Sequence, residues 1–404
     1  MSRKPSIGRV VILVENLPVP LDRRVWLEAT TLRDAGWQVV IIGPRGDRGM
    51  RRLRETLDGI EVLRYPQHEA AGLSGYLVEY LPSMVFTAAW LLWARLTGPV
   101  DVVHGCNPPD LFWVFGLVGR LWGARYVYDE HDPNPELSAT KFGRHGLKGR
   151  FLNRLTLMLE AASFRTASLV LTVNDTCRDL ILGRSGLDER DVLVLMNAPD
   201  VGHVRRLAAG TEPEGRRIGY VGVMGTHDGL EVLADAWALV KGESDMGDAV
   251  LDLVGDGPAR GRAEVRVRKL GVTSSVRFHG FQPPSVYVPI LARCVAGVSP
   301  DLPTLFNNLA SMVKLMDYMA IGRVCVTFRL TESSRMAGPA LVIAEPANSR
   351  GLADALLGIL RNAEEAGRLG DAASKRLDEL DLRWDPYGEA LVDAYRSLVN
   401  NHRA

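Results

Sequence analysis

Short aliphatic runs alternate with stretches of helical periodicity along most of the chain. Residues 9–14 are apolar and β-branched, residues 21–37 place apolar side chains on one helical face, and residues 39–44 are apolar again. Because a strand, a helix and a further strand in this order form a crossover unit, the opening predicts a parallel sheet. The connecting loop, residues 15–21, contains no glycine, so the GxGxxG fingerprint of dinucleotide-binding folds is absent there.

The alternation occurs in two blocks, separated by the polar and breaker-rich residues 199–216, which we interpret as a linker. In the first block we expect further strands at residues 101–104, 126–128, 168–174 and 192–197, and helices at residues 111–122 and 147–166. In the second block we expect strands at residues 218–221, 250–254, 276–279, 324–328 and 341–343, and helices at residues 230–240, 285–294 and 351–361. The pattern predicts an α/β chain with two doubly wound, Rossmann-like domains, residues 1–198 and 217–383, and a helix in residues 384–404.

The most apolar segment of the chain is residues 75–96. It is about long enough to span a bilayer, but Glu79, Pro82 and Arg95 interrupt it, so we do not expect a transmembrane helix. Two interpretations stay open: a core helix of the first domain, or an interfacial helix whose aromatic side chains enter a membrane, helped by the basic run of residues 45–54. The aromatic side chains in question are Tyr80, Phe86, Trp90 and Trp93.

Composition adds bounds to this picture. A length of 404 residues suits two domains, and 48 basic against 48 acidic residues give no reason to expect nucleic-acid binding. The apolar run at the start is too short for a signal peptide. The four cysteines form no CxxC pair and fit reduced, buried thiols; they are Cys106, Cys177, Cys294 and Cys325. We therefore expect a cytoplasmic protein, with peripheral contact at the inner membrane face if residues 75–96 are interfacial.

Polar residues mark the ends of two strands in the first block. His104 ends one strand and Asn107 lies in the turn after it, while His131 and Asp132 follow the next strand. Ligands of parallel sheets bind beyond the carboxyl ends of the strands, so these four residues are expected on one rim. The alternative is that the histidines are structural.

A second candidate site lies in residues 306–326, which read as a loop, a helix and a strand. Ser311 is the expected N-cap, and Lys314 and Asp317 lie three residues apart in the first half of the helix. A helix N-terminus favours an anion, so a phosphate is expected there, with a carboxylate one turn deeper for sugar hydroxyls. The alternative is an ordinary amphipathic helix with a surface Lys–Asp pair.

Seven stretches, in this order and spacing, resemble the GT-B fold glycosyltransferases related to glycogen and sucrose synthases. The likeness is greatest to bacterial polysaccharide and natural-product enzymes of that group. The stretches are ENLPVPLDRRVWLEA (15–29), DVVHGCNPPD (101–110), VYDEHDPNPEL (127–137), IGYVGVMGTHDGLEVL (218–233), LVGDGP (253–258), VRFHG (276–280) and KLMDYMAIG (314–322).

The resemblance implies two Rossmann-like domains facing across a cleft, with residues 384–404 crossing back to the first. It also implies sugar transfer from a nucleoside diphosphate donor, held by the second domain, to an acceptor hydroxyl on a glycan, glycolipid or natural product, held by the first. Such enzymes usually retain the anomeric configuration and need no metal or other cofactor. The absence of an Asp-x-Asp pair agrees with that expectation, and the leaving diphosphate would then need cationic side chains and helix N-termini.

The chain departs from the family pattern at three positions. Val223 and Asp228 stand where the family commonly has an arginine and a lysine, and Leu309 stands where it has the first of two glutamates. We infer that Lys314 takes over the phosphate role and that Asp317 keeps the ribose contact. The backbone of Gly225 and Thr226 and the helix start at Ser311 would assist Lys314, and Asn307 or Asn308 would meet hydroxyls of the donor sugar.

The resemblance further places His131 near the reacting centre, where it would contact a sugar hydroxyl or position the acceptor. Asp132 or Glu130 would be a local base, unless the leaving phosphate serves as the base. The turn at Gly257 and the segment around Phe281 would approach the nucleobase. On the acceptor side we expect Asn16, His104 and Asn107.

Two other functions are open on the sequence alone. A sugar-nucleotide epimerase or oxidoreductase on tandem Rossmann folds would use the glycines that begin at Gly255, although Pro258 interrupts their pattern. A catalytically silent GT-B partner protein would explain Val223, Asp228 and Leu309. The sequence does not specify the sugar, the base or the acceptor.

Overall fold

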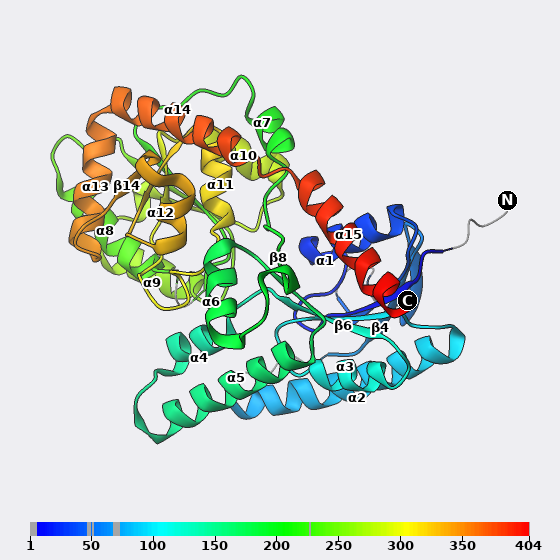
Figure 1. Cartoon of the computed structure of the whole chain (residues 1–404). Coiled ribbons are helices and arrows are strands. Elements are labelled where there is room, and N and C mark those ends of the chain that lie inside the picture. Colours follow the sequence, from blue (N-terminus) through cyan, green and yellow to red (C-terminus); the bar gives the residue numbers. More distant parts are fainter. Residues whose placement is uncertain (1–5, 47–49, 51, 68–72, 226–227, 404) are drawn as a thin grey trace. The chain divides into compact units, whose positions relative to one another are not determined.

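The computed structural model describes residues 6–46, 50, 52–67, 73–225 and 228–403. It divides into two compact units, which we call the first unit (Met1–Met196 with Trp384–Ala404) and the second unit (Asn197–Arg383). Each unit is a largely parallel sheet with helices against it (Figure 1). The expected fold class, α/β with two Rossmann-like domains, is confirmed.

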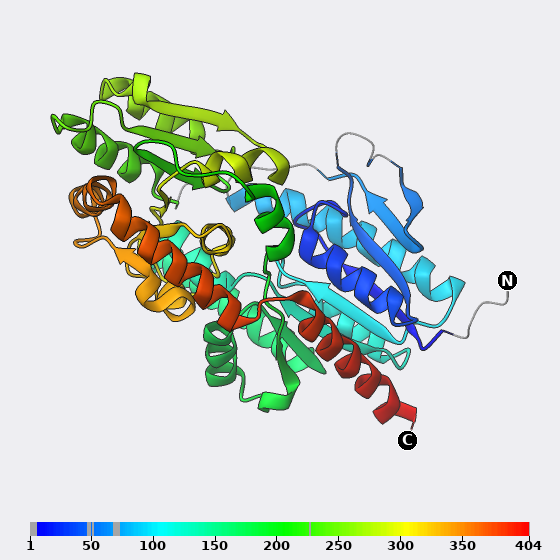
Figure 2. The ribbon, with the colours of Figure 1, turned by 90° about the horizontal axis from the view of Figure 1, so that it is seen from above.

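The sheet of the first unit has eight strands in the order β3-β4-β2-β1-β5-β6-β7-β8. All neighbouring pairs are parallel except β3 with β4, a hairpin whose β3 lies at the edge of the sheet (Figure 2). The strands are β1 Arg9–Leu13, β2 Gln38–Pro44, β3 Arg54–Leu57, β4 Ile60–Tyr65, β5 Val102–Cys106, β6 Arg125–Glu130, β7 Leu169–Thr172 and β8 Val192–Val194. The hairpin was not expected, because a charged strand such as RETL lacks an apolar pattern.

Helices cover both faces of this sheet. On one face, α1 and α15 pack over β1 with Val25, Leu391 and Tyr395 in the core, and Figure 1 shows α15 (red) beside α1 (blue). On the other face, Leu91 of α2 and Phe115 of α3 share a core with the opposite side chains of the same strands. The helices are α1 Arg23–Asp34, α2 Leu73–Thr97, α3 Trp113–Arg120, α4 Asn134–Phe142, α5 Gly146–Thr166, α6 Asp175–Ser185 and α15 Trp384–Arg403.

The sheet of the second unit has six strands, all parallel, in the order β11-β10-β9-β12-β13-β14. The strands are β9 Arg217–Val221, β10 Val250–Val254, β11 Val276–Gly280, β12 Ala296–Ser299, β13 Val324–Thr327 and β14 Leu341–Ile343. The helices are α7 Val201–Ala208, α8 Leu230–Gly242, α9 Arg260–Lys269, α10 Pro284–Ala292, α11 Val313–Ala320, α12 Thr331–Ala337, α13 Ser349–Arg361 and α14 Ala363–Leu380. The core lies around the fully buried Trp237.

Residues 199–216 are not a plain linker, because they contain the helix α7. Asp200 caps it by accepting a hydrogen bond from the backbone N–H of His203, at 2.8 Å. The helix packs on α10 and α11 of the second unit. A single turn-forming residue before a short amphipathic stretch thus suffices to order this connection.

Candidate functional site

The first candidate site lies at the carboxyl edge of the first sheet, where three adjacent strands end. β5 pairs with β1 on one side and β6 on the other, so the residues after these strands are neighbours. The carboxamide oxygen of Asn107 accepts hydrogen bonds from the backbone N–H groups of His131 (2.6 Å) and Asp132 (3.2 Å). Its NH₂ group donates to the carbonyl of Asp132 at 2.7 Å. Asn107 is buried and holds the His131–Asp132 turn in place.

The imidazole of His131 is fixed by a buried carboxylate. Its Nε2 lies 2.6 Å from Oδ2 of Asp129, and Arg24 from α1 donates to Oδ1 of the same carboxylate at 2.7 Å. Burial lowers the pKa of His131, but attraction to Asp129 outweighs it, so this pKa is raised above the ordinary value. Burial opposes ionisation of Asp129, yet Arg24 and His131 hold its pKa well below its usual range. The His131 ring is therefore fixed in orientation, and its protonated form is favoured by Asp129.

His104 is not on the rim, and that expectation is wrong. β5 continues to Cys106, so His104 is an interior strand residue and is fully buried. Its Nδ1 lies 2.7 Å from the hydroxyl of Tyr395 on α15, and its Nε2 lies 3.4 Å from Asp129. Burial lowers the pKa of His104, and the fully buried ring cannot meet an acceptor.

The buried charges around Asp129 form one network. Glu28, one turn after Arg24 on α1, lies 3.1 Å from the Arg24 guanidinium, and burial next to Asp129 raises the pKa of Glu28 to about 8. His104, Cys106 and Asp129 are close enough to one another to hold a metal ion. However, Arg24 already places its positive charge against Asp129, and burial raises the pKa of the Cys106 thiol. We interpret the cluster as an ion-pair network.

The loop after β1 carries Glu15 and Asn16. Asn16 is exposed, as expected of an acceptor-side residue, whereas Glu15 is buried beside Gln67, whose amide donates to its carboxylate at 2.7 Å. Burial and the nearby Glu79 raise the pKa of Glu15 to about 7. Glu15 is thus a titratable group at this edge that the sequence did not single out, since an isolated Glu in a loop gives no signal.

The second candidate site lies at the carboxyl edge of the second sheet. There the backbones after β9 and β10 touch: a Cβ on Gly255 would lie 1.9 Å from the carbonyl oxygen of Gly222. Gly257 has φ +152°, and a Cβ there would lie 2.7 Å from the carbonyl oxygen of Met224. Only glycine fits either position. The N–H of Gly257 donates to the Asp256 side chain at 2.8 Å.

The departure from the family at Asp228 has a structural reason. The Asp228 carboxylate accepts a hydrogen bond from the backbone N–H of Gly225 at 2.7 Å, which closes the loop after β9. The Gly225 amide, expected to meet a phosphate, is therefore already engaged in this structure. Thr226, expected beside it, lies outside the described residues.

Lys314 lies in the first turn of α11 and is almost fully buried. Its Nζ is 2.9 Å from Oδ2 of Asp301, the residue that follows β12 by two positions, and 5.0 Å from the centre of the Tyr220 ring. Burial lowers the pKa of Lys314, but Asp301 outweighs it and raises that pKa above the ordinary value. The lysine is a permanent cation. The expected N-cap is wrong: α11 begins at Val313, Met312 occupies the N-cap position, and Ser311 precedes it.

Asp317 faces a different partner from Lys314. Its carboxylate accepts a hydrogen bond from the Tyr287 hydroxyl of α10 at 3.1 Å, and it is buried. The next residue, Tyr318, fixes α11 to the sheet, since its hydroxyl accepts from the N–H of Val221 (3.1 Å) and donates to the carbonyl of Val298 (3.2 Å). Lys314 and Asp317 therefore do not form the surface Lys–Asp pair of the alternative interpretation.

The two asparagines before α11 hold their own loop. Asn307 is buried and donates to the carbonyl of Leu302 at 2.9 Å. Asn308 donates to the carbonyl of Thr304 at 2.8 Å and accepts from the N–H of Thr331 at 3.0 Å. By contrast, Phe281, which follows β11, is 81% exposed at the same edge of the sheet.

The residues that sequence reasoning missed are mainly the buried partners: Arg24, Glu28, Asp129, Asp301 and Tyr287. Asp129 stands only two positions before His131, a spacing that puts both side chains on one side of an extended segment. That spacing could have identified Asp129 as the partner of His131. No such spacing links Asp301 to Lys314, because the two residues belong to separate elements.

Comparisons with known proteins match both units. Residues 215–362 match the family model described as glycosyl transferases group 1, and residues 21–198 match that of the glycosyl transferase 4-like domain. A 2-deoxystreptamine N-acetyl-D-glucosaminyltransferase from Streptomyces fradiae is 29% identical over 275 residues, which span 64% of this chain and 61% of that protein. The chain thus matches about three fifths of that relative's length.

Solved structures of low identity share the fold. Sucrose-phosphate synthase from Thermosynechococcus elongatus has a TM-score of 0.73 at 17% identity, over 98% of this chain and 100% of the other. WaaG, a glycosyltransferase of lipopolysaccharide biosynthesis, has a TM-score of 0.68 at 18% identity, over 95% and 98%. HepE from Anabaena, in complex with UDP and glucose, has a TM-score of 0.65 at 15% identity, over 98% and 100%.

Proposed function

Since the chain belongs to the GT-B glycosyltransferases related to glycogen and sucrose synthases, we propose that it transfers a sugar from a nucleoside diphosphate donor to an acceptor hydroxyl. The observation that carries the proposal is Lys314: a buried, permanently charged amine in the first turn of α11, beside glycine loops that bring backbone close. Neither an epimerase nor a silent partner protein is favoured by the relatives.

The second unit is proposed to hold the donor. The diphosphate gains negative charge as it leaves, and Lys314 together with the N-terminus of α11 would stabilise that charge without a metal ion. The exposed ring of Phe281 offers a face for a nucleobase, and Asp317 a carboxylate for ribose hydroxyls. Asn307 and Asn308 are proposed to shape the loop, with sugar contacts through its backbone.

The first unit is proposed to hold the acceptor. In the transfer, the bond between the anomeric carbon and the phosphate oxygen breaks, and a bond from that carbon to the acceptor oxygen forms. The acceptor proton passes to the leaving diphosphate or to Asp132, and the anomeric configuration is retained. His131, held through Nε2 by Asp129, positions a substrate hydroxyl through its other ring nitrogen, Nδ1.

The proposed acceptor is a hydroxyl of a glycan, glycolipid or natural product, with the exposed Asn16 on the acceptor side and Asn107 as the support of His131. The relative from Streptomyces fradiae bears a name that specifies 2-deoxystreptamine, and its likeness supports a small hydroxylated acceptor as one option. Four buried thiols without a disulfide support a reducing compartment, so we place the enzyme in the cytoplasm.

The test is calorimetric titration with UDP, GDP and dTDP. Removing Lys314 alone would leave Asp301 buried and unpaired, so the informative variant is Lys314→Met combined with Asp301→Asn. Loss of a charged contact to the diphosphate should weaken binding on the order of 30-fold. The matched control is Arg217→Met with Asp252→Asn, a buried pair of the same sheet whose Arg217 is the first residue of β9, at 2.7 Å.

The control should lose stability but keep nucleotide affinity. The proposal fails if wild type binds none of the three nucleotides, or if both double variants bind as wild type does.

A further inference from the structure

We propose that the outer face of α2, α3 and α5 in the first unit docks on an anionic lipid bilayer. We call this surface the helical face. The proposal begins with exposed apolar side chains: of the 22 large hydrophobic residues exposed in the described chain, 11 lie on these three helices and one more, Leu121, is the C-cap residue of α3. They are Leu81, Val85, Phe86, Leu92, Leu96, Val114, Leu117, Val118, Leu121, Leu147, Phe151 and Met158. Such a concentration marks an interaction surface.

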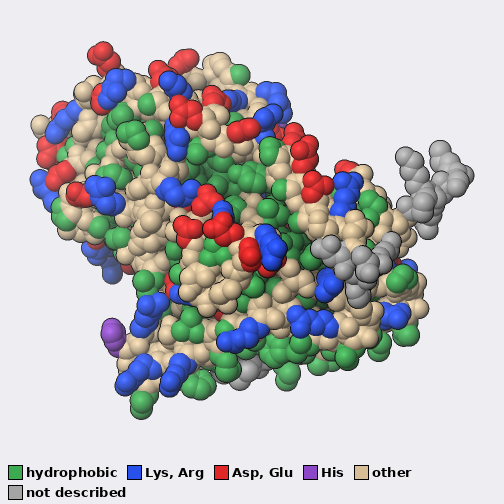
Figure 3. Space-filling view, in the orientation of Figure 1, with side chains coloured by type: hydrophobic (Ala, Val, Ile, Leu, Met, Phe, Trp, Pro, Cys, Tyr) green, Lys and Arg blue, Asp and Glu red, His purple; other side chains and the backbone are tan. Residues whose placement is uncertain are grey.

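The three helices present these side chains in one direction. Their inner sides share one core on the same face of the sheet, with Leu91 from α2, Phe115 from α3 and Phe164 from α5. Their outer sides therefore look away from that sheet together. Figure 3 shows hydrophobic side chains along the lower edge of the view, where Figure 1 places α2 and α5, with Lys and Arg among them.

Helix α2 shows most directly that something is needed to cover this face. A surface helix normally has a polar outer side, but α2 is apolar on both sides, with Leu91 in the core and Leu81 69% exposed. On α5, Leu147 is 85% and Phe151 66% exposed. Among the described residues, no helix is long and apolar enough to cross a membrane. The face would therefore lie in the interfacial region of a bilayer.

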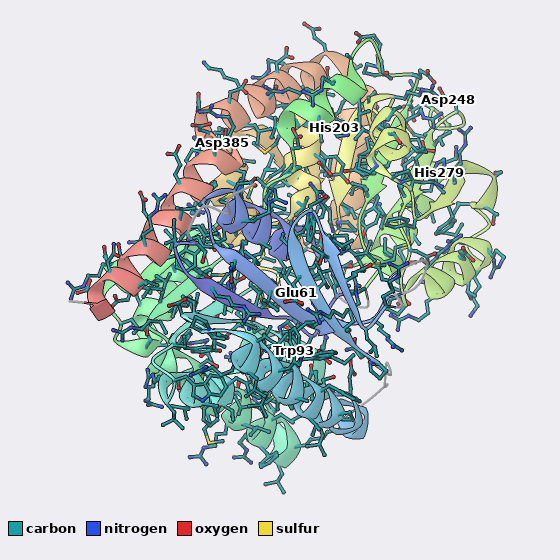
Figure 4. The ribbon with its side chains drawn as sticks, turned by 90° about the vertical axis from the view of Figure 1, so that its right-hand side faces the viewer. Glu61, Trp93, His203, Asp248, His279 and Asp385 are labelled. Carbon is teal, nitrogen blue, oxygen red and sulfur yellow. The ribbon has the colours of Figure 1, made fainter. Side chains whose placement is uncertain are left out.

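Two of the four aromatic residues that the sequence assigned to the membrane pack against the sheet instead. Trp90 is half-buried and donates its indole N–H to the carbonyl of Arg64 at 3.2 Å. Trp93 lies under the guanidinium of Arg54, 4.4 Å from its ring centre, and Arg54 also pairs with Glu61 on the adjacent strand; Figure 4 labels Trp93 and Glu61. The outward face is therefore mainly aliphatic, with the exposed Phe86 and Phe151 among its side chains. The basic run expected to help lies partly outside the described residues.

The charge of the helical face indicates that its partner is an anionic lipid surface. The exposed charged side chains in the described parts of α2, α3 and α5 are all basic: Arg95, Arg120, Lys148, Arg150, Arg154 and Arg165. The two acids of these helices are turned inward: Glu160 is buried beside Arg184, and Glu79 is half-buried near Glu15. Leucines flanked only by cations match an anionic lipid surface. A protein partner would more often meet tyrosine, tryptophan and mixed charge.

The experiment is co-sedimentation of the full chain with vesicles of phosphatidylcholine containing about 30% phosphatidylglycerol, at about 0.05 M salt. Wild type should bind these vesicles, bind pure phosphatidylcholine more weakly, and leave the anionic vesicles at about 0.5 M salt, where charge is screened within a few ångströms. No binding to anionic vesicles at low salt overturns the proposal.

Two variants test the two components of the helical face. Leu147→Ser with Phe151→Ser should weaken vesicle binding on the order of 100-fold, because two apolar side chains are removed. Lys148→Glu with Arg154→Glu should weaken it on the order of 30-fold, from about fivefold for each lost cation. All four side chains are exposed, so thermal unfolding should change little.

Matched controls change the same chemistry elsewhere. Leu239→Ser with Val265→Ser removes exposed apolar side chains of the second unit, and Arg190→Glu with Arg350→Glu reverses exposed cations off the helical face. Both controls should bind vesicles as wild type does. Equal binding by the test and control variants overturns the proposal. So does a dimer in sedimentation equilibrium that only Leu147→Ser with Phe151→Ser dissociates, since a second copy would then cover the face.

Docking on lipid would also narrow the acceptor to one presented at the membrane, a glycolipid. This consequence rests on the proposed function, whereas the docking surface does not. Nucleotide affinity, measured on the same variants, separates the two: it should stay at the wild-type value in all of them. If the protein docks on vesicles but binds no nucleotide, the docking proposal stands and the proposed function fails.

Discussion

The carboxyl edges of the two sheets both lie beyond the ends of parallel strands but carry different kinds of chemistry. In the first unit, one buried carboxylate, Asp129, serves Arg24, His131 and His104 at once. In the second unit, Lys314 has one carboxylate, Asp301, and the surrounding loops are shaped by glycine. The first edge therefore offers a titratable ring held by a network, and the second a permanent cation held by a single pair.

This difference indicates how the proposed work is divided. A leaving diphosphate gains negative charge during the reaction, so a cation that does not titrate near neutral pH suits it. An acceptor hydroxyl must be oriented toward the anomeric carbon, and an imidazole held by a buried carboxylate suits that task. The substitutions below test this division of roles.

The largest effect on stability is expected when the network in the first unit loses the carboxylate of Asp129. Asp129→Asn removes the carboxylate that Arg24, His131 and His104 share and leaves the buried Arg24 with Glu28 alone, which should cost about 3 kcal/mol of unfolding free energy. Asp301→Asn should cost less, because a lysine side chain is flexible enough to turn its ammonium toward water. Hydrogen exchange followed peptide by peptide measures each unit separately. Equal losses in both units would contradict the comparison.

His131→Ala should act on turnover instead. Loss of a positioned acid–base group typically reduces the rate about 100-fold or more, and donor affinity should stay within about twofold of wild type. The control is His203→Ala, an exposed histidine at the start of α7 (Figure 4). Initial rates and calorimetry on the same preparations give both quantities. A fall in donor affinity that matches the fall in rate would place His131 on the donor side.

Phe281→Ala should give a smaller effect on the second edge alone. Stacking of a ring on a nucleobase contributes about 1 kcal/mol, which corresponds to about fivefold weaker nucleotide binding. Because the ring is 81% exposed, stability should not change. Phe281→Tyr keeps the ring and should keep the affinity. Unchanged binding in the alanine variant would remove Phe281 from the donor site.

The smallest effect is the pH dependence that separates the two edges. The pKa of His131 is raised in the folded state, so its stabilising contribution is complete below the ordinary imidazole pKa and is lost as pH rises through the raised value. The difference in urea midpoint between wild type and His131→Gln should therefore shrink as pH rises. The groups facing the ring are Asp129, Arg24 and Asp22. A difference that grows with pH would contradict the charged state of His131.

The sequence predicted what depends on local periodicity. The parallel strands, the long α2 and the shared rim of Asn107 and His131 all follow from alternation and from polar residues at strand ends. Lys314 was also identified, because a basic residue in the first turn of a helix is a local signal. The direction of a side chain was harder: the sequence could not show that Trp90 and Trp93 face the sheet.

What the sequence missed depends on contacts between distant segments. The hydroxyl of Tyr395 reaches His104 across 291 residues of chain, and Arg24 reaches Asp129 across 105. Neither contact leaves a periodic signal, so His104 was placed at the rim instead of in the core. The predicted N-cap of α11 was wrong for another reason. Ser311 has a side chain suited to capping, but the helix begins one residue later than a cap at Ser311 requires.

Helix α15 has a consequence for how the protein is made. It belongs to the first unit, yet all of residues 197–383 precede it in the chain. A ribosome therefore completes every strand of both sheets before the helix that contributes Leu391 and Tyr395 to the first core exists. The second unit is one continuous segment, so its whole sequence is available while the first unit still lacks its last helix. The unit that is begun first is thus the last to have all of its core residues.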